Sequence, residues 1–502
     1  MNSLELIKLY QKDAFIKSLS YWLNDDNQKQ KALRGLVGGL KYLIPSVVFN
    51  NLNKSFCFVV ENKEVAFSFF YNLKTILSKE NIYLFPSLGH KYYDEEKIEN
   101  SNVVLRGEVL SLIKEKKKEK KIIITYPDAV FEKVIGKSQL SNKSLNLILE
   151  HEISYLELES KLITLGFEQS DFIEEVGQYS IRGQVFDIYS FACPLPFRIT
   201  FDENKIKKIS TFDLESQLSI ETKTQITVLA NPSSLNKNSK NISFFEHLDE
   251  TFMIWVQSKK DCALKIEALF KKSKEVFNDI GSKTDIVVSS PPENLFINKK
   301  MFNNCLNRFS SVDFGVFNVN KSMDIYEYKS KTQPDFNKNL NLLEKDLEKL
   351  TYKNYSLVIA FQSEEQAERI SVYFNSKNNN IQYSSSVMVL SEGFVDENIG
   401  LAYYTDHQIF NRYFKFKSPL FSGVKRRKIK HLTNHNKLNV GDYLVHIDYG
   451  VGRFLGLEKI KVRNILQEVI KISYQNNDLV YVGINSLHKI SKYVGNILNP
   501  KL

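Results

Sequence analysis

The chain has 502 residues, a formal net charge of +10 and a sequence pI of about 9.0. Its 43% hydrophobic and 25% charged residues exclude a globally disordered protein, and its length suits roughly three to four domains. The basic excess permits contact with nucleic acid or with an acidic protein surface, but it is thin for a chain of this length.

Residues 1 to about 145 alternate between helical and strand patterns. A helix is predicted at Glu64–Leu77, and short apolar strands are predicted at Ser55–Val60, Ile82–Phe85 and Ile122–Thr125. Strand, helix and strand at this spacing predict a parallel, doubly wound sheet. The run Lys114–Lys121 is interpreted as a solvated helix end, because mixed-sign charge runs usually lie on exposed helices.

The segment Gly35–Tyr42 is the nearest match to a phosphate-binding loop. Such a loop needs glycine amides around the phosphates, a lysine directly after the last glycine, and a small hydroxyl residue for magnesium. Here Leu40 precedes Lys41, and Tyr42 stands where the hydroxyl residue belongs. We therefore predict a glycine-rich approach to a helix that binds no nucleotide.

Residues 146–235 change in character and predict a compact α+β domain inserted into the first one. A helix is predicted at Tyr155–Leu165, and strands are predicted at Tyr179–Tyr189, Phe197–Phe201 and Ile206–Phe212. The apolar strand pattern of Phe244–Val256 indicates that the first domain then resumes. Residues 1–145 and 236–330 are thus expected to form one domain.

Two arginines mark the predicted insert. Arg182-Gly183 is expected to start a strand that carries Asp187, and Arg198 is expected on the next strand. Exposed arginines on adjacent strands would offer several donors to carboxylate groups of a partner. The alternative is a surface salt bridge, which stabilises a fold by only about 0–1 kcal/mol.

Residues 340–424 predict a further α/β domain. Its expected helices are Leu342–Leu350 and Glu364–Phe374, and its expected strands are Ser356–Phe361 and Gly400–Thr405. His407 lies at its end without a supporting nucleophile or carboxylate cluster nearby in sequence, so a structural role is expected. Residues 425–439 begin with the basic run Lys425–Lys430 and are interpreted as a linker.

Residues 440–502 predict a small β domain. Tyr443, Val445 and Ile447 alternate along a strand that runs into Gly450-Val451-Gly452, and a second strand leaves at Arg453. Two strands joined in this way indicate a hairpin, the start of a small barrel. Further alternating runs follow at Glu468–Tyr474 and Leu479–Ile484.

The cysteines and apolar runs bear on location. Neither a zinc site nor a disulfide framework is indicated, because the four cysteines form no C-x-x-C pair: Cys57, Cys193, Cys262 and Cys305. No apolar run approaches the ~18 residues of a membrane span, and the N-terminus lacks a signal-peptide pattern. We expect a cytoplasmic protein without a membrane partner.

The span Tyr179–Gln217 resembles the second domain of UvrB and of transcription-repair coupling factors of the Mfd type, which docks onto UvrA. The shared elements are R-G, D-I-Y, R-I-x-F and F-D-x-x-x-Q, in this order. The resemblance implies that Arg182, Arg198 and Phe201 lie on a UvrA-facing surface. The family usually has a pair of phenylalanines after the second arginine, whereas this chain has Phe201-Asp202. The resemblance therefore implies that Asp202 removes an apolar contact from this surface.

The span Val440–Tyr493 resembles the RNA-polymerase-interacting module that these coupling factors share with CarD-type regulators. Val480-Tyr481-Val482, Ile484 and Leu487 fit its closing strand and turn. The resemblance implies docking by strand addition to the polymerase β subunit. The edge is expected at Leu455–Val462, with contacts from Leu455, Leu457, Ile460 and Val462.

Together these resemblances imply the N-terminal region of a coupling factor that recognises stalled RNA polymerase and recruits UvrA in nucleotide excision repair. The implied fold is a UvrB-like doubly wound domain with an α+β insert, a third α/β domain and a CarD/Tudor-like barrel. No enzymatic activity and no cofactor are expected for these residues. ATP, Mg²⁺ and most DNA contacts would belong to an ATP-dependent DNA translocase motor expected beyond Leu502.

Two alternative functions are also considered. One is a UvrB-like, nucleotide-dependent DNA-repair enzyme subunit, which the degenerate loop at Gly35–Tyr42 opposes. The other is a CarD-type transcription regulator, which the pattern at Tyr179–Gln217 opposes.

Overall fold

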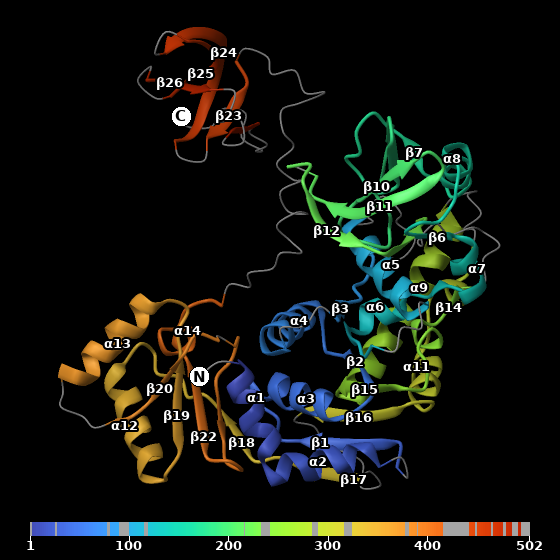
Figure 1. The fold of residues 1–502 in the computed structure, drawn as a ribbon. Coiled ribbons are helices and arrows are strands. Elements are labelled where there is room, and N and C mark those ends of the chain that lie inside the picture. Colours follow the sequence, from blue (N-terminus) through green and yellow to red (C-terminus); the bar gives the residue numbers. More distant parts are fainter. Residues whose placement is uncertain are drawn as a thin grey trace. The chain divides into compact units, whose positions relative to one another are not determined.

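A computed structural model describes most of the chain as two compact units, residues 1–416 and 417–502 (Figure 1). The described residues are 3–25, 28–77, 81–89, 100–114, 119–214, 216–231, 241–283, 290–315, 324–376, 381–388, 390–414, 441–446, 449–462, 465–474, 478–483 and 490–492. The predicted linker 425–439 and residues 115–118 of the lysine run lie outside them, as do Ile484 and Leu487 of the predicted closing strand and turn.

The first domain is built on a seven-stranded parallel sheet. Its strands, in spatial order, are β17 (Asp324–Glu327), β1 (Gln30–Arg34), β16 (Ser310–Gly315), β15 (Phe252–Gln257), β2 (Ser55–Val59), β4 (Ile122–Thr125) and β3 (Ile82–Leu84). The central strands are continuous apolar runs, as expected for strands buried on both faces. The chain leaves this sheet after β4 and returns at β15, so both predicted segments contribute to it.

Helices complete the first domain. They are α1 (Ser3–Lys12), α2 (Ala14–Asn24), α3 (Leu40–Asn51), α4 (Lys63–Leu77), α5 (Asn100–Lys114), α6 (Pro127–Phe131), α9 (Lys259–Lys283), α10 (Pro292–Leu295) and α11 (Lys299–Leu306). Trp255 packs between Phe56 and Phe58 with ring centroids 5.6 and 5.7 Å away, which places an aromatic core on the sheet.

The insert contains a six-stranded sheet covered on one face by α8 (Tyr155–Thr164). The strand order is β12 (Ser219–Lys223), β11 (Lys205–Phe212), β10 (Phe197–Asp202), β9 (Val185–Ile188), β8 (Gln178–Arg182) and β7 (Glu168–Gln169). Leu158 and Leu162 of α8 pack with Ile199 of β10 in one hydrophobic core. Short elements lead into and out of the insert: β5 (Val134–Ile135), α7 (Lys137–Asn142), β6 (Ser144–Ile148), β13 (Gln225–Leu229), β14 (Asn241–Ile242) and η2 (Phe244–Glu246).

The third domain has a five-stranded mixed sheet. The spatial order of the strands is β18 (Ser330–Thr332), β21 (Phe394–Asp396), β22 (Leu401–Thr405), β19 (Ser356–Ala360) and β20 (Ser384–Ser386). Along the chain, the short helix α14 (Asp406–Ile409) directly follows β22. Helices α12 (Leu340–Tyr352) and α13 (Glu364–Ser376) lie on one flank of the sheet (Figure 1). Leu347 and Phe374 pack there against Ile359.

The C-terminal unit is an antiparallel sheet in the order β26 (Leu479–Gly483), β25 (Ile465–Ser473), β24 (Gly450–Val462), β23 (Tyr443–His446) and β27 (Ile490–Lys492). The predicted hairpin is confirmed, but β24 already begins at Gly450, so the turn lies earlier than expected. Leu444, between Tyr443 and Val445, is the buried residue of β23, and Ile447 lies outside the described residues. Closure of the sheet into a barrel stays a prediction.

Gly452 is required where β24 meets the neighbouring strand. A Cβ atom there would lie 2.5 Å from Ile472 and 2.9 Å from the Tyr474 ring.

The described helices of the chain include none that is long and apolar enough to cross a bilayer.

Candidate functional site

The two arginines of the insert bind one carboxylate. Asp187 lies on β9, between Arg182 at the end of β8 and Arg198 on β10. Oδ1 of Asp187 accepts a hydrogen bond from Nε of Arg198 at 2.8 Å, and Oδ2 accepts from Nη2 of Arg198 at 2.9 Å and also from Arg182. The Asp187 side chain is 1% exposed, while those of Arg182 and Arg198 are 37% and 20% exposed.

This arrangement corrects two sequence-based expectations. Arg182 ends β8 and Gly183 occupies a left-handed turn position at φ +58°, so the pair does not start a strand. The arginines are not on adjacent strands either, because β9 lies between them. Their shared partner is buried, so the bridge is no simple surface salt bridge.

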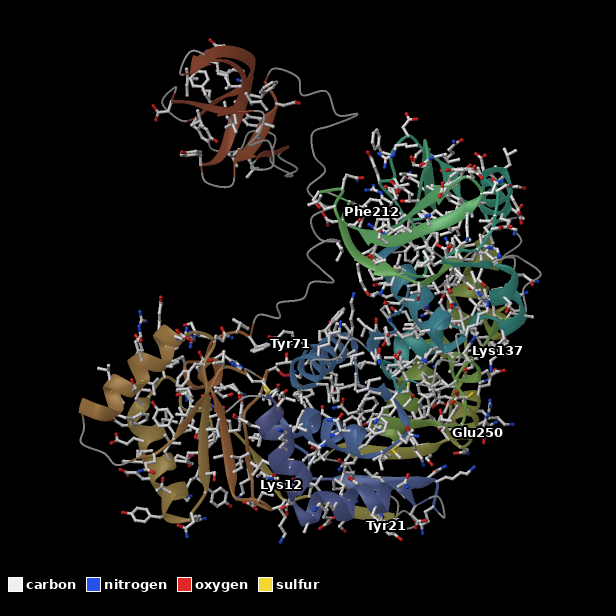
Figure 2. All side chains as sticks on the ribbon, in the orientation of Figure 1. Lys12, Tyr21, Tyr71, Lys137, Phe212 and Glu250 are labelled. Carbon is white, nitrogen blue, oxygen red and sulfur yellow. The ribbon has the colours of Figure 1, made fainter. Side chains whose placement is uncertain are left out.

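Other residues of the insert bind the guanidinium of Arg198 through hydrogen bonds and a contact with an aromatic ring. It donates to the backbone carbonyl and to the side-chain Oε1 of Gln217, both at 2.9 Å. It also lies over the ring of Phe212, labelled in Figure 2, with 4.0 Å to the ring centroid. The F-D-x-x-x-Q element, which contains Phe212 and Gln217, thus fixes the orientation of Arg198.

Arg182 is the more accessible of the two cations. Its guanidinium lies 4.8 Å from the ring centroid of Phe172, an exposed aromatic residue. Leu218, also exposed, directly follows Gln217. Sequence reasoning did not single out Phe172 or Leu218. We call Phe172, Arg182, Arg198 and Leu218 the arginine patch.

The prediction that Phe201 belongs to a partner-facing surface is wrong. Phe201 is 1% exposed and lies in the core of the insert, with ring centroids 4.7 Å from Tyr155 and 6.3 Å from Phe186. The period-two alternation of β10 explains this, since Phe201 shares the α8-facing side with Ile199 while Arg198 lies on the other side. Asp202 is exposed and pairs with Lys207 at 3.3 Å.

The predicted polymerase-docking edge lies in the second half of β24. Pairing with β23 ends at Arg453, whereas pairing with β25 continues to Val462. No described strand pairs with the other side of β24 from Leu455 onward, which leaves an edge there among the residues that the structure covers. Leu455 is 40% exposed. The side chains of Leu457, Ile460 and Val462 lie outside the described part of the structure.

The degenerate phosphate loop lies next to the third domain. Nζ of Lys41 donates to Oε1 of Glu392 at 2.6 Å, and the Tyr42 hydroxyl donates to the same atom at 3.2 Å. Burial opposes the charge on Lys41, but Tyr42 and Glu392 outweigh it and raise the pKa of the ammonium. The amides of Leu40, Lys41 and Tyr42 bond to loop carbonyls at 3.2, 3.4 and 3.1 Å. The loop therefore offers little to a phosphate.

His407 is buried in the third domain. Its Nε2 lies 3.0 Å from the carbonyl oxygen of Ser391, and burial lowers the pKa of the imidazole. This placement agrees with the structural role expected from the sequence.

Burial also raises the pKa of the Cys193 and Cys262 thiols to about 12. Among the described residues, no group of three or more His, Cys, Asp or Glu side chains could hold a metal ion.

Two family models match the chain. The UvrB interaction domain matches residues 145–233, and the CarD-like/TRCF RID domain matches residues 438–494. The first match contains the arginine patch, and the second contains all of β23 to β27.

Curated relatives give the same result. The transcription-repair-coupling factor of Bacillus subtilis (strain 168) is 22% identical over 93% of this chain and 45% of its own length. Those of Borreliella burgdorferi and Staphylococcus aureus (strain MRSA252) are 23% and 21% identical over 77% and 70% of this chain, and over 36% of their own lengths. The chain thus spans less than half the length of these relatives. Its resemblance to transcription-repair-coupling factors is confirmed.

Proposed function

We propose that this chain is the partner-binding part of a transcription-repair coupling factor, which recognises stalled RNA polymerase and recruits UvrA to DNA lesions. The observation that carries the proposal is that one chain combines a UvrB interaction domain with a CarD-like/TRCF RID domain. The first would bring UvrA and the second RNA polymerase. A cytoplasmic location follows from these proposed partners.

For UvrA, the proposed contact surface is the arginine patch. Two guanidinium groups share the single carboxylate of Asp187, which leaves one positive charge in excess. A carboxylate on the partner could bind the exposed side of Arg182, because guanidinium groups recognise carboxylates through paired hydrogen bonds. Phe172 and Leu218 would supply the apolar contacts that Phe201 cannot supply from the core.

For RNA polymerase, the proposed contact is the edge of β24 at Leu455–Val462. An edge strand has unpaired backbone groups that can extend a sheet of another protein. Leu455 would contribute an apolar contact beside this edge, and Leu457, Ile460 and Val462 are proposed to do the same. We also propose that the C-terminal sheet closes into a small barrel of the CarD/Tudor type.

ATP-driven chemistry is not proposed for these residues. The ion pair of Lys41 with Glu392 opposes the alternative of a UvrB-like nucleotide-dependent enzyme, because it engages the one lysine that a phosphate would need. ATP, Mg²⁺ and most DNA contacts are proposed for a motor outside this sequence. Turnover of ATP that Lys41→Ala abolishes would contradict this assignment.

The proposal is tested by co-elution of the 502-residue chain with UvrA, with a polymerase β fragment, and with both. We expect both partners in one complex, because the insert and the C-terminal unit are separate parts of the chain. A chain that binds neither partner would overturn the proposed function.

A further inference from the structure

The degenerate phosphate loop contacts a segment of the third domain. We propose that the loop residues Gly38, Gly39, Lys41 and Tyr42 form a binding site whose ligand is the chain's own segment Leu390–Phe394, with the Glu392 carboxylate in the place of a phosphate. This assignment does not rest on the proposed function.

The charges of the contact match those of an anion site. Oε1 of Glu392 lies 2.6 Å from Nζ of Lys41 and 3.2 Å from the Tyr42 hydroxyl oxygen. Helix α3 begins immediately after Gly39, and its first turn carries the positive end of the helix dipole. The direct contacts to the Glu392 carboxylate come from the side chains of Lys41 and Tyr42, since the amides of this turn bond to loop carbonyls.

The glycines are needed because the segment comes very close to the loop. A Cβ atom at Gly38 would lie 2.2 Å from the carbonyl oxygen of Gly393. One at Gly39 would lie 2.6 Å from the carbonyl oxygen of Glu392 and 2.9 Å from the Phe394 ring. The glycine-rich sequence therefore fits a peptide ligand and needs no nucleotide to explain it.

A third set of contacts binds the segment beside the loop. Asn72 of α4 is fully buried, donates from Nδ2 to Oγ of Ser391 at 2.8 Å and accepts from the Ser391 amide at 2.9 Å. A side-chain amide that satisfies both the hydroxyl and the backbone of one residue recognises a peptide in a defined position.

The third domain holds the segment in its bound shape. The carbonyl of Ser391 lies 3.0 Å from Nε2 of His407, and the amide of Gly393 donates to Oε1 of Gln408 at 2.6 Å. A ligand fixed before binding loses little conformational entropy. These contacts give His407 a positioning role for the segment.

The experiment measures amide hydrogen exchange in peptides that cover Gly38–Leu43 and Leu390–Phe394 of the full chain. Glu392→Gln and Lys41→Met should each speed exchange in both peptides by about tenfold, which corresponds to about 1.4 kcal/mol. The double variant should exchange no faster than the faster-exchanging of the two single variants, because both changes remove the same Lys41–Glu392 ion pair. The matched control is the exposed pair Lys331–Glu397 of the third domain, whose loss should leave both peptides unchanged.

Gly39→Ala provides an independent test that leaves the charges intact. Gly39 is the N-cap of α3 and has helical backbone angles, φ −62° and ψ −19°, which alanine can adopt without strain. The proposal expects faster exchange at Leu390–Phe394, because the added methyl group displaces the segment. Exchange equal to that of the parent in Glu392→Gln and in Gly39→Ala would overturn the proposal, as would slower exchange of the parent loop on addition of ATP and Mg²⁺.

Discussion

Asp187 and Arg198 face each other across β9 and β10, with Nε of Arg198 2.8 Å from Oδ1 of Asp187. The carboxylate is buried, and it also binds Arg182 from the other side. The same contact therefore stabilises the insert and sets the direction of both cations, which makes Asp187 a positioning residue for the proposed UvrA surface.

Asp187→Asn should destabilise the insert. The change removes the charge-assisted hydrogen bonds that the buried carboxylate accepts from two partly exposed guanidinium groups, which should cost about 1.5–3 kcal/mol. Hydrogen exchange of the β9 and β10 peptides would measure the loss of opening free energy. The control is Asp202→Asn, which removes an exposed pair with Lys207 and should cost about 0–1 kcal/mol. Equal effects of the two variants would contradict the role assigned to Asp187.

Phe172→Ala should weaken binding of UvrA without unfolding the insert. Phe172 is exposed and lies under the Arg182 guanidinium, so its loss removes apolar contact area and support for the cation. Truncation of a central aromatic contact typically costs about 2 kcal/mol or more, which is over tenfold in Kd. Leu156→Ala on α8 is the matched control, because it removes an exposed apolar residue away from the patch.

The double variant Arg182→Ala, Arg198→Ala should also weaken UvrA binding, and it needs a check of folding because Arg198 binds Asp187 and Gln217. Affinity measured at rising salt should fall faster for the parent than for this variant, since exposed charges are screened within ~8 Å at physiological ionic strength. A folded variant with parental affinity would place the UvrA contact elsewhere.

Sequence reasoning identified the strands of the insert and the two arginines, because apolar periodicity and residue type are local signals. It placed Phe201 on the partner-facing side of the sheet instead of in the core, since the face on which a strand residue lies depends on the register of the whole sheet. Phe201 and Arg198 are three positions apart in one strand and lie on opposite faces. The regular alternation F-R-I-T-F at Phe197–Phe201 was the available signal for this difference.

The contact between Lys41 and Glu392 could not have been predicted from either motif alone. The sequence showed that the loop departs from a phosphate-binding pattern, but the two residues are 351 positions apart. Such a pairing depends on how the third domain packs on the first. Gly39 gave a partial signal, because a glycine next to a helix start also permits close approach of another backbone.

Glu108→Gln should stabilise residues 1–416 more at pH 7.5 than at pH 5. Burial raises the pKa of Glu108 to about 7, with Lys74 opposing the shift. The folded state therefore binds this proton more tightly than the unfolded state, and stability falls as pH rises from about 4.5 to about 7. One pKa unit corresponds to about 1.4 kcal/mol, so glutamine should recover about 1–3 kcal/mol at pH 7.5. Hydrogen exchange of α5 at both pH values measures this, and the exposed Glu157→Gln is the control.

Leu455→Asp should weaken binding of the chain to a polymerase β fragment, whereas Leu479→Asp should not. Both leucines belong to the C-terminal sheet, and they are 40% and 44% exposed, but Leu455 lies on the β24 edge and Leu479 on the opposite edge strand, β26. A charge at the docking edge must be desolvated on binding, which should raise Kd by about tenfold or more. Fluorescence anisotropy measures Kd, and circular dichroism confirms that both variants fold. Ile460→Pro adds a backbone test, because proline has no amide hydrogen to pair with an incoming strand, and Ile460→Asp controls for damage to the sheet. Weakening by Leu479→Asp alone would place the polymerase on β26 instead.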